Sequence, residues 1–122
     1  MPQPNISGYI TIAKTGTAGP AQVKYAVIDA ALLGNNTLVA AVTAKKIRVI
    51  SMFYMASGAV TAIFQSGAGG TALTGGLQHT AQTGMVLPDN EDGWFETAAG
   101  SLLNINLSGA VSVDGALSYI EI

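Results

Sequence analysis

The sequence predicts an all-β fold, an antiparallel β-sandwich that is most simply a jelly roll of about eight short strands. Apolar and polar residues alternate with a period of two rather than 3.6 through most of the chain, as expected of strands with one buried face. Gly, Asn and Pro interrupt these segments at short intervals, which is typical of turns between strands. With 122 residues, the chain is long enough for one core shared by two sheets.

The amino-terminal part predicts an arm followed by the sandwich. Residues 1–20 are rich in Pro and Gly and predict an extended N-terminal arm, whereas residues 21–122 predict a single β-sandwich domain. Weaker strand patterns lie at 6–13, 23–30 and 37–42. The Ala-rich residues 25–33 are compatible with a helix by propensity, but their β-branched side chains favour a strand.

The centre of the chain predicts a β-hairpin. The segment KKIRVISMFYM at 45–55 is followed by the dipeptide Ser57-Gly58, which suits a tight turn because Gly accepts a positive φ. The chain then returns as AVTAIFQS, with Val60, Ala62 and Phe64 on one face. Strict alternation in the first strand gives two sets of side chains: Ile47, Val49, Ser51, Phe53 and Met55 on one face, and Lys46, Arg48, Ile50, Met52 and Tyr54 on the other.

The carboxyl-terminal third predicts a second hairpin. In SLLNINL at 101–107, Leu and Ile alternate with Asn, and the tetrapeptide SGAV of the first turn recurs at 108–111. The chain ends with VSVDGALSYIEI, in which Asp114-Gly115 predicts a bulge or a second tight turn. Short strands are also expected at 84–87 and 93–97.

The chain is poor in charge. Charged residues make up 10% of the sequence and hydrophobic residues 49%, whereas about a quarter of residues are charged in typical soluble proteins. A free globule with so few charges has little to keep it apart from its neighbours, so we expect other protein to cover part of its surface. No apolar run reaches the roughly 18 to 20 residues of a membrane-spanning helix, and the N terminus lacks the pattern of a secretory signal. We therefore expect no membrane partner.

The charges are unevenly distributed along the chain. Residues 1–48 hold all five Lys and Arg residues and one acid, for a net charge of +4, and residues 49–122 hold six acids and no base, for a net charge of −6. If the two halves formed different faces, the molecule would be a dipole that docks in one orientation. Strands of both halves that interleave would blur this effect.

Motifs for catalysis, a cofactor or a metal are weak. His79, the only histidine, is expected in an exposed loop, without the partners that a metal site or a catalytic triad needs. The acidic segment DNEDG at 89–93 lacks the spacing of a calcium loop and predicts a solvated turn. GAGGTA at 67–72 follows a strand, but no helix begins there to hold a pyrophosphate. We expect no catalytic residues, no cofactor and no metal.

Two features are candidates for a protein interface. The basic cluster KKIR at 45–48 is too small for a nucleic-acid site in a chain of net charge −2, so we expect no nucleic-acid partner. Trp94 and Phe95 are adjacent on a strand and point to opposite faces, so one is expected in the core and the other as an interface anchor. The candidate interface residues are Lys45, Lys46, Arg48, Phe53, Tyr54, Trp94 and Phe95.

Several segments resemble a recurring module of tailed-bacteriophage virion proteins. They are KKIRVIS, ASGAVTAIFQSGAGGTALTG, GWFETAAG and LNINLSGAVSVDGALSYIEI, and the resemblance covers about residues 37–122. In a small chain it implies a capsid decoration (cement) protein, a β-sandwich or jelly roll that forms a homotrimer on the outer surface of the capsid. Such a protein binds the major capsid protein at three-fold positions of the shell and ties its subunits together. The resemblance implies no catalytic residues.

Two other classes of function stay open. The first is a tail-fibre or receptor-binding β module of the virion, in which Trp94 and Tyr54 would be the candidates for contact with a glycan. The second is a small β enzyme, which would need a convergent acid, base or metal site. His79 and Asp92 would be its candidates.

Overall fold

The computed structural model describes residues 21–122, which form ten strands, without a helix, in two antiparallel sheets. The predicted all-β sandwich is therefore confirmed. The strands are β1 (Lys24–Ala30), β2 (Gly34–Val39), β3 (Ile47–Ala56), β4 (Val60–Ser66), β5 (Thr71–Ala72), β6 (Leu77–His79), β7 (Thr83–Leu87), β8 (Phe95–Glu96), β9 (Leu103–Leu107) and β10 (Val113–Glu121). The expected arm, residues 1–20, and the strand expected at 6–13 lie outside the described residues.

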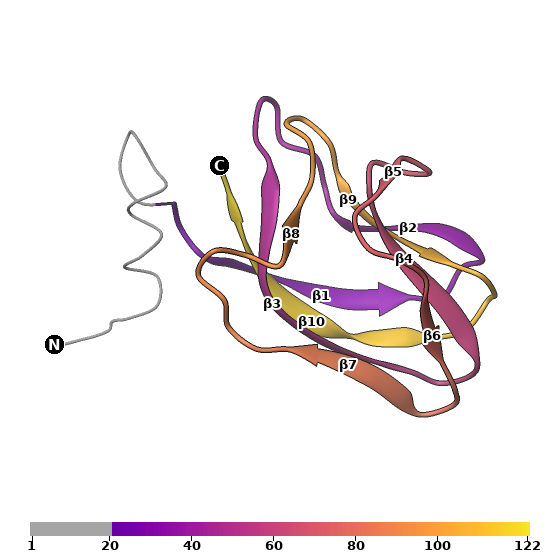
Figure 1. Ribbon diagram of the computed structural model, residues 1–122. Helices are drawn as coiled ribbons and strands as arrows, with labels where there is room; N and C mark the ends of the chain where they lie inside the picture. Colours follow the sequence, from indigo (N-terminus) through magenta and orange to yellow (C-terminus); the bar gives the residue numbers. More distant parts are fainter. Residues whose placement is uncertain (1–20) are drawn as a thin grey trace, which may run out of the picture.

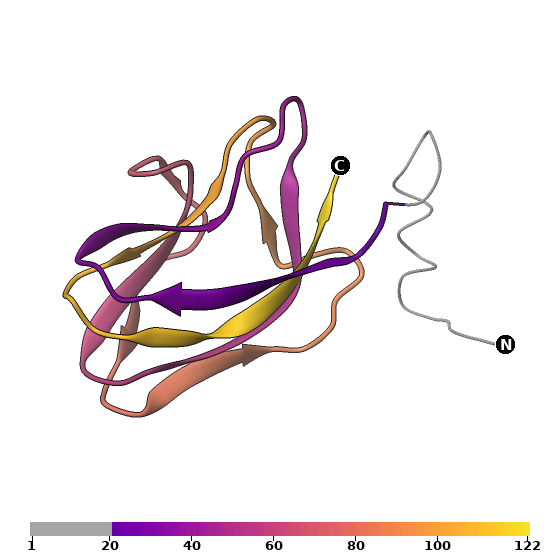
Figure 2. The ribbon, with the colours of Figure 1, turned by 180° about the vertical axis from the view of Figure 1, so that it is seen from behind.

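The strands form two five-stranded layers (Figure 1). Sheet A has the order β1-β10-β3-β7, and the short β8 also pairs with β3. Sheet B has the order β2-β9-β4-β5, and β6 also pairs with β4. Figure 2 shows the molecule from behind, with the paired strands β1 and β10 of sheet A in the layer nearer the viewer.

The core lies between the sheets and takes every second side chain of the central strands. Phe64 on β4 is fully buried. Its ring centroid lies 5.9 Å from that of Tyr54 on β3 and 5.3 Å from that of Phe95 on β8, so one aromatic cluster joins the two sheets. In β9 the inward positions are the apolar ones expected from the sequence: Leu103, Ile105 and Leu107.

The two segments expected to form hairpins instead cross from one sheet to the other. β3 belongs to sheet A and β4 to sheet B, and the two strands do not pair; the same holds for β9 in sheet B and β10 in sheet A. Both hairpin predictions are wrong. Alternating apolar residues are expected equally of two strands paired within a sheet and of two strands that face each other across a core.

The two SGAV segments are the corners at which these crossings occur. The backbone N–H of Ser57 donates to the carbonyl oxygen of Ser112 (2.9 Å), and the N–H of Ser108 donates to the carbonyl oxygen of Thr61 (3.0 Å). The corners therefore lie side by side. The repeated tetrapeptide marks two equivalent changes of sheet rather than two hairpin turns.

A β-bulge changes the phase of β3. Ser51 lies opposite Ser118 of β10, whereas Val49 lies opposite Tyr119, so Ile50 is an extra residue on β3. Strict alternation along this strand is therefore wrong, because an extra residue exchanges the inward and outward sets beyond it. Beyond the bulge the buried residues are Met52, Tyr54 and Ala56, and the exposed residues are Phe53 and Met55.

The last strand is longer and more regular than expected. Asp114 and Gly115 lie inside β10, where they pair with β1 on one side and with β3 on the other. The bulge or turn expected at this dipeptide is absent from β10. The Gly serves a different purpose there, because it allows the backbone of β3 to approach closely.

Charges from the two halves of the sequence are interleaved. β1 and β3 both pair with β10, and Lys24 Nζ lies 2.9 Å from Glu121 Oε1 at the end of that strand. Arg48 of β3 and Lys46, which immediately precedes that strand, also pair with Glu96 of β8. The charges of the two halves of the chain are therefore interleaved within residues 21–122, which is the arrangement expected to blur a dipole.

Candidate functional site

The outer face of sheet A carries an exposed apolar surface. Val27, Ala116, Phe53 and Val86 lie directly opposite one another across β1, β10, β3 and β7, and residues opposite one another share one face of a sheet. We call this line of four residues the apolar row. It runs from one edge of the sheet to the other.

Two more rows flank the apolar row on the same face. The acidic row consists of Asp29, Asp114, Met55 and Gly84, and the hydroxyl row consists of Tyr25, Ser118 and Ser51. The large apolar side chains of the three rows are exposed by the following fractions: Tyr25 80%, Val27 74%, Val86 73%, Phe53 56% and Met55 56%. We call the three rows together the sheet A face. An exposed apolar patch of this kind marks an interaction surface in soluble proteins.

The outer face of sheet B is mostly polar, and its amide side chains bond to one another, although the buried Asn104 Oδ1 has no hydrogen-bond partner within residues 21–122. Asn104 Nδ2 donates to Asn35 Oδ1 (3.0 Å) and to Gln65 Oε1 (2.8 Å), and Asn106 Nδ2 donates to the same Asn35 oxygen (3.1 Å). The N–H of Gly69, in the Gly-rich loop, also donates to Asn35 Oδ1 (3.0 Å). The two faces of the sandwich thus differ in chemistry, and of the two only the sheet A face is suited to dry protein contact.

The sequence contains a reason for this difference. In β1 the inward residues are Ala26, Ile28 and Ala30, and two of the three outward residues, Tyr25 and Val27, are apolar as well, with Asp29 the third. Apolar residues on both sides of a strand are typical of a strand that is covered on both faces. Within residues 21–122 nothing covers Tyr25 or Val27, which leaves that task to another surface.

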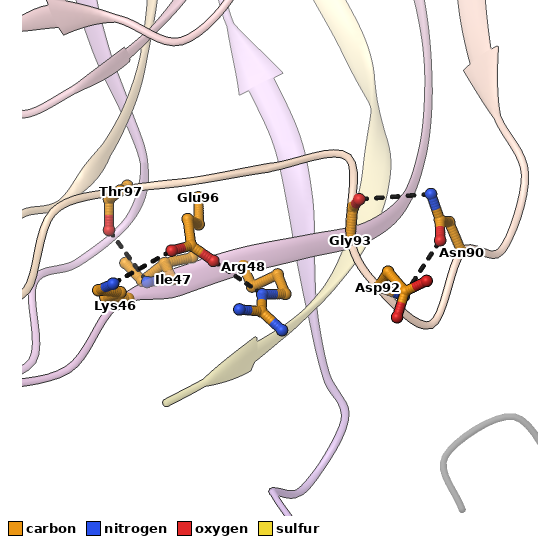
Figure 3. Close-up of polar contacts among 8 residues, drawn as sticks. All are labelled: Lys46, Ile47, Arg48, Asn90, Asp92, Gly93, Glu96 and Thr97. Atoms are coloured by element: carbon orange, nitrogen blue, oxygen red, sulfur yellow. Dashed lines mark hydrogen bonds and ion pairs between the residues drawn. The ribbon is translucent and has the colours of Figure 1, made fainter. Parts of the chain in front are cut away.

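The basic cluster is mostly paired within the chain. Glu96 Oε2 lies 3.3 Å from Lys46 Nζ, and Glu96 Oε1 accepts a hydrogen bond from Arg48 Nε at 2.8 Å (Figure 3). Burial raises the pKa of Glu96, but the hydrogen bonds from Arg48 and Lys46 outweigh it and hold that pKa below its ordinary value. Lys45 is exposed. Of the three basic candidates for the interface, two are therefore engaged by one carboxylate.

The acidic loop is a turn held by Asn90. Its Oδ1 accepts the N–H of Asp92 (3.1 Å), and its Nδ2 donates to the carbonyl oxygen of Gly93 (3.3 Å), as Figure 3 shows. Gly93 has a φ of 82°, a conformation that Gly adopts without strain. The loop therefore has the turn conformation expected from the sequence.

Tyr54 and His79 lie elsewhere than the sequence suggested. Tyr54, expected at an interface, is a core residue with only 4% of its surface exposed, because the bulge turns it inward. His79, expected in an exposed loop, lies half-buried on β6, and its Nε2 is 2.8 Å from Tyr54 Oη. Burial raises the pKa of Tyr54 to about 12, so the phenol stays neutral and bridges the two sheets.

The two adjacent aromatic residues divide as expected between core and surface. Phe95 packs against Phe64, whereas Trp94 is 42% exposed and donates its indole N–H to the carbonyl oxygen of Pro88 (2.8 Å). Both border a cleft of about 220 Å³ at the edge of the sandwich. The other lining residues are Leu73, Thr74, Leu77, Met85 and Leu87. The cleft is apolar and lies apart from the three rows of the sheet A face.

Groups for metal or phosphate chemistry are missing from the described part of the chain. Among residues 21–122, no cluster of three or more His, Cys, Asp or Glu side chains could hold a metal ion. The segment 67–72 forms a turn and the short strand β5 rather than the start of a helix. No helix long and apolar enough to cross a membrane occurs within residues 21–122.

Of the candidate interface residues, Phe53 is the one that belongs to the sheet A face. The sequence analysis missed Tyr25, Val27, Met55 and Val86 as candidates. For β1 the signal was the pair of apolar residues, Tyr25 and Val27, at outward positions. For β3 it was the phase change at the bulge, which alternation alone does not show. A scan against protein-family models and searches of curated proteins and of solved structures return no match.

Proposed function

We propose that this chain is a structural virion protein that decorates and stabilises a phage capsid by binding the shell of the major capsid protein on its outer surface. The observation that carries the proposal is the sheet A face, where a row across the sheet is entirely apolar and where Val27, Phe53 and Val86 of that row are exposed. The position at contacts between coat subunits comes from the resemblance of residues 37–122 to virion modules. A low charge content and a face ready for dry contact support the same function.

The physical basis of such a function is mass action. A protein that binds the assembled shell and not free coat subunits stabilises the shell by RT ln(1 + [L]/Kd) at each site. Many modest contacts then add up, so no single one needs to be strong. The sheet A face suits such contacts because its apolar rows need no polar partner.

The alternative, a tail-fibre or receptor-binding module, would need a polar and aromatic site for a glycan. The cleft beside Trp94 has an exposed aromatic ring, but Thr74 is the one polar side chain among its seven lining residues. A sugar would leave most of its hydroxyl groups without partners there, which is costly in a buried contact. The geometry therefore favours binding to protein over binding to a glycan.

We expect the chain to co-sediment with empty heads assembled from the coat protein of the same virion. We expect Val86→Lys to reduce the bound fraction at least tenfold, because the substitution places an unpaired charge in an apolar contact. Gln78→Lys adds the same charge to the exposed surface of β6 in sheet B and serves as the matched control. Heads that retain Val86→Lys as well as they retain the control, or that bind neither the variants nor the unmodified chain, would contradict the proposal.

A further inference from the structure

We propose that the sheet A face packs against the same face of a second copy of this chain, around a two-fold axis that runs along the apolar row. The inference rests on the proposed function in taking this face as the docking surface, and it concerns the free chain: a second copy covers the face in solution, and the shell displaces that copy when the chain docks. The evidence for this packing is that the apolar row lies between the acidic row and the hydroxyl row.

The face has a different chemistry on each side of the apolar row. Asp29 and Asp114 lie opposite each other on one side, where like charges on paired strands repel. Tyr25 lies opposite Ser118 on the other side. None of the eleven residues in the three rows is basic, so no cation of the face itself neutralises the two carboxylates.

Two symmetric ways of packing this face on itself can be compared. A two-fold axis parallel to the strands would place the acidic row of one copy against the acidic row of the other. An axis along the apolar row, across the strands, reverses the strand direction and places the acidic row against the hydroxyl row. Both arrangements stack the apolar row on itself, but only the second separates the two acidic rows and places the Tyr25 hydroxyl of one copy opposite Asp29 of the other.

The hydroxyl row has one exposed donor for this purpose, Tyr25. The Tyr25 side chain is the most exposed large apolar residue within 21–122, and its phenol can donate to Asp29 of the other copy. Ser51 Oγ and Ser118 Oγ are 2.5 Å apart. One of these hydroxyls donates to the other, and Ser118 is only 6% exposed, so the two serines satisfy each other within the chain.

The size of the face sets the strength of the pair. Four strands spaced about 4.8 Å apart and about seven residues long give a flat face on the order of 400 Å² on each copy. The area buried by two copies thus falls in the range of weak, reversible interfaces, below about 1,200 Å² in total. We therefore expect a dimer whose population rises with concentration, rather than a permanent one.

The first test is sedimentation equilibrium of the full chain from about 10 µM to about 1 mM, a range that spans weak dissociation constants. We expect a monomer–dimer equilibrium that Val86→Lys weakens at least tenfold, because the axis sets the two new charges against each other. Gln78→Lys, on sheet B, leaves the equilibrium unchanged. A monomer throughout, a closed trimer, or equal behaviour of the two variants would overturn the inference.

The second test fixes the axis and uses the absence of cysteine from the chain. Ala116→Cys places a thiol in the middle of the apolar row, where each copy meets its own equivalent, and a short bismaleimide should link two chains there. Gln78→Cys should not be linked. The same linking is repeated with a chain that lacks residues 1–20. If only this shortened chain were linked or formed dimers, residues 1–20 would be the segment that covers the sheet A face, and the inference would be overturned.

These outcomes are separable from those of the proposed function. A dimer that ignores empty heads leaves the self-association standing and contradicts the capsid function. A strict monomer that binds heads through the sheet A face leaves the capsid function standing and contradicts the self-association.

Discussion

Phe64→Ala is expected to lower the free energy of unfolding by about 3 to 5 kcal/mol, the range for removal of a fully buried phenylalanine. The Phe64 ring contacts Tyr54 and Phe95 across the core, so the truncation removes the centre of the cluster that joins the two sheets. Neither neighbour can fill the space, because Tyr54 is held by His79 and Phe95 by the pairing of β8 with β3. Urea unfolding followed by tryptophan fluorescence measures the change.

The matched control is Ile63→Ala, one residue earlier on the same strand. Ile63 points to the outer side of sheet B and is half-exposed, so its truncation is expected to cost about 1 kcal/mol. Equal losses for the two variants would mean that β4 does not direct Phe64 into the core, and the assignment of inward and outward faces would fail.

Gly115→Ala is the second substitution with a large expected effect. A Cβ at this position would lie 1.9 Å from the carbonyl oxygen of Phe53 and 2.6 Å from the Cα of Tyr54. Both atoms belong to the backbone of β3, so the strand itself must move. We expect a loss of about 3 kcal/mol, at the upper end of the usual cost of overpacking, and a weaker dimer as well, because β3 carries Phe53 of the sheet A face.

The control for this substitution is Gly109→Ala in the second SGAV corner, where a Cβ meets nothing within 4 Å. Its stability should stay within about 0.5 kcal/mol of the unmodified chain. Thermal unfolding of the two variants under the same conditions measures the difference in their stability. A Gly115→Ala protein as stable as Gly109→Ala would show that β10 and β3 do not approach as closely as described.

The all-β class could be predicted because period-two alternation survives in β4 and β9, where Phe64 and Ile105 take inward positions. Which strands pair with each other could not be predicted from the sequence. A strand that faces another across the core has the same alternation as one that is hydrogen-bonded to it, and the Ser-Gly corners suit either geometry. The hairpin predictions failed for this reason, whereas the individual strands and the core residues of β4 and β9 were placed correctly.

The candidate site could be predicted only in part for a related reason. The single extra residue Ile50 reverses the faces of β3, which sends Tyr54 into the core and Phe53 to the surface. No local composition marks such a bulge. Trp94 and Phe95 were divided between surface and core as predicted, although Trp94 immediately precedes β8 rather than lying on it.

The claim on which the account depends is that the sheet A face is buried by protein in the assembled virion. Val86→Cys tests it most directly, as the rate of maleimide labelling in the free chain compared with the rate in the chain bound to empty heads. Thr61→Cys on sheet B, a position that points away from this face, gives the reference rate. The account predicts that binding slows labelling of the Val86→Cys thiol at least tenfold while the Thr61→Cys thiol stays accessible, in line with exclusion of water from an apolar contact. Equal labelling of the Val86→Cys variant in its free and bound forms would contradict it.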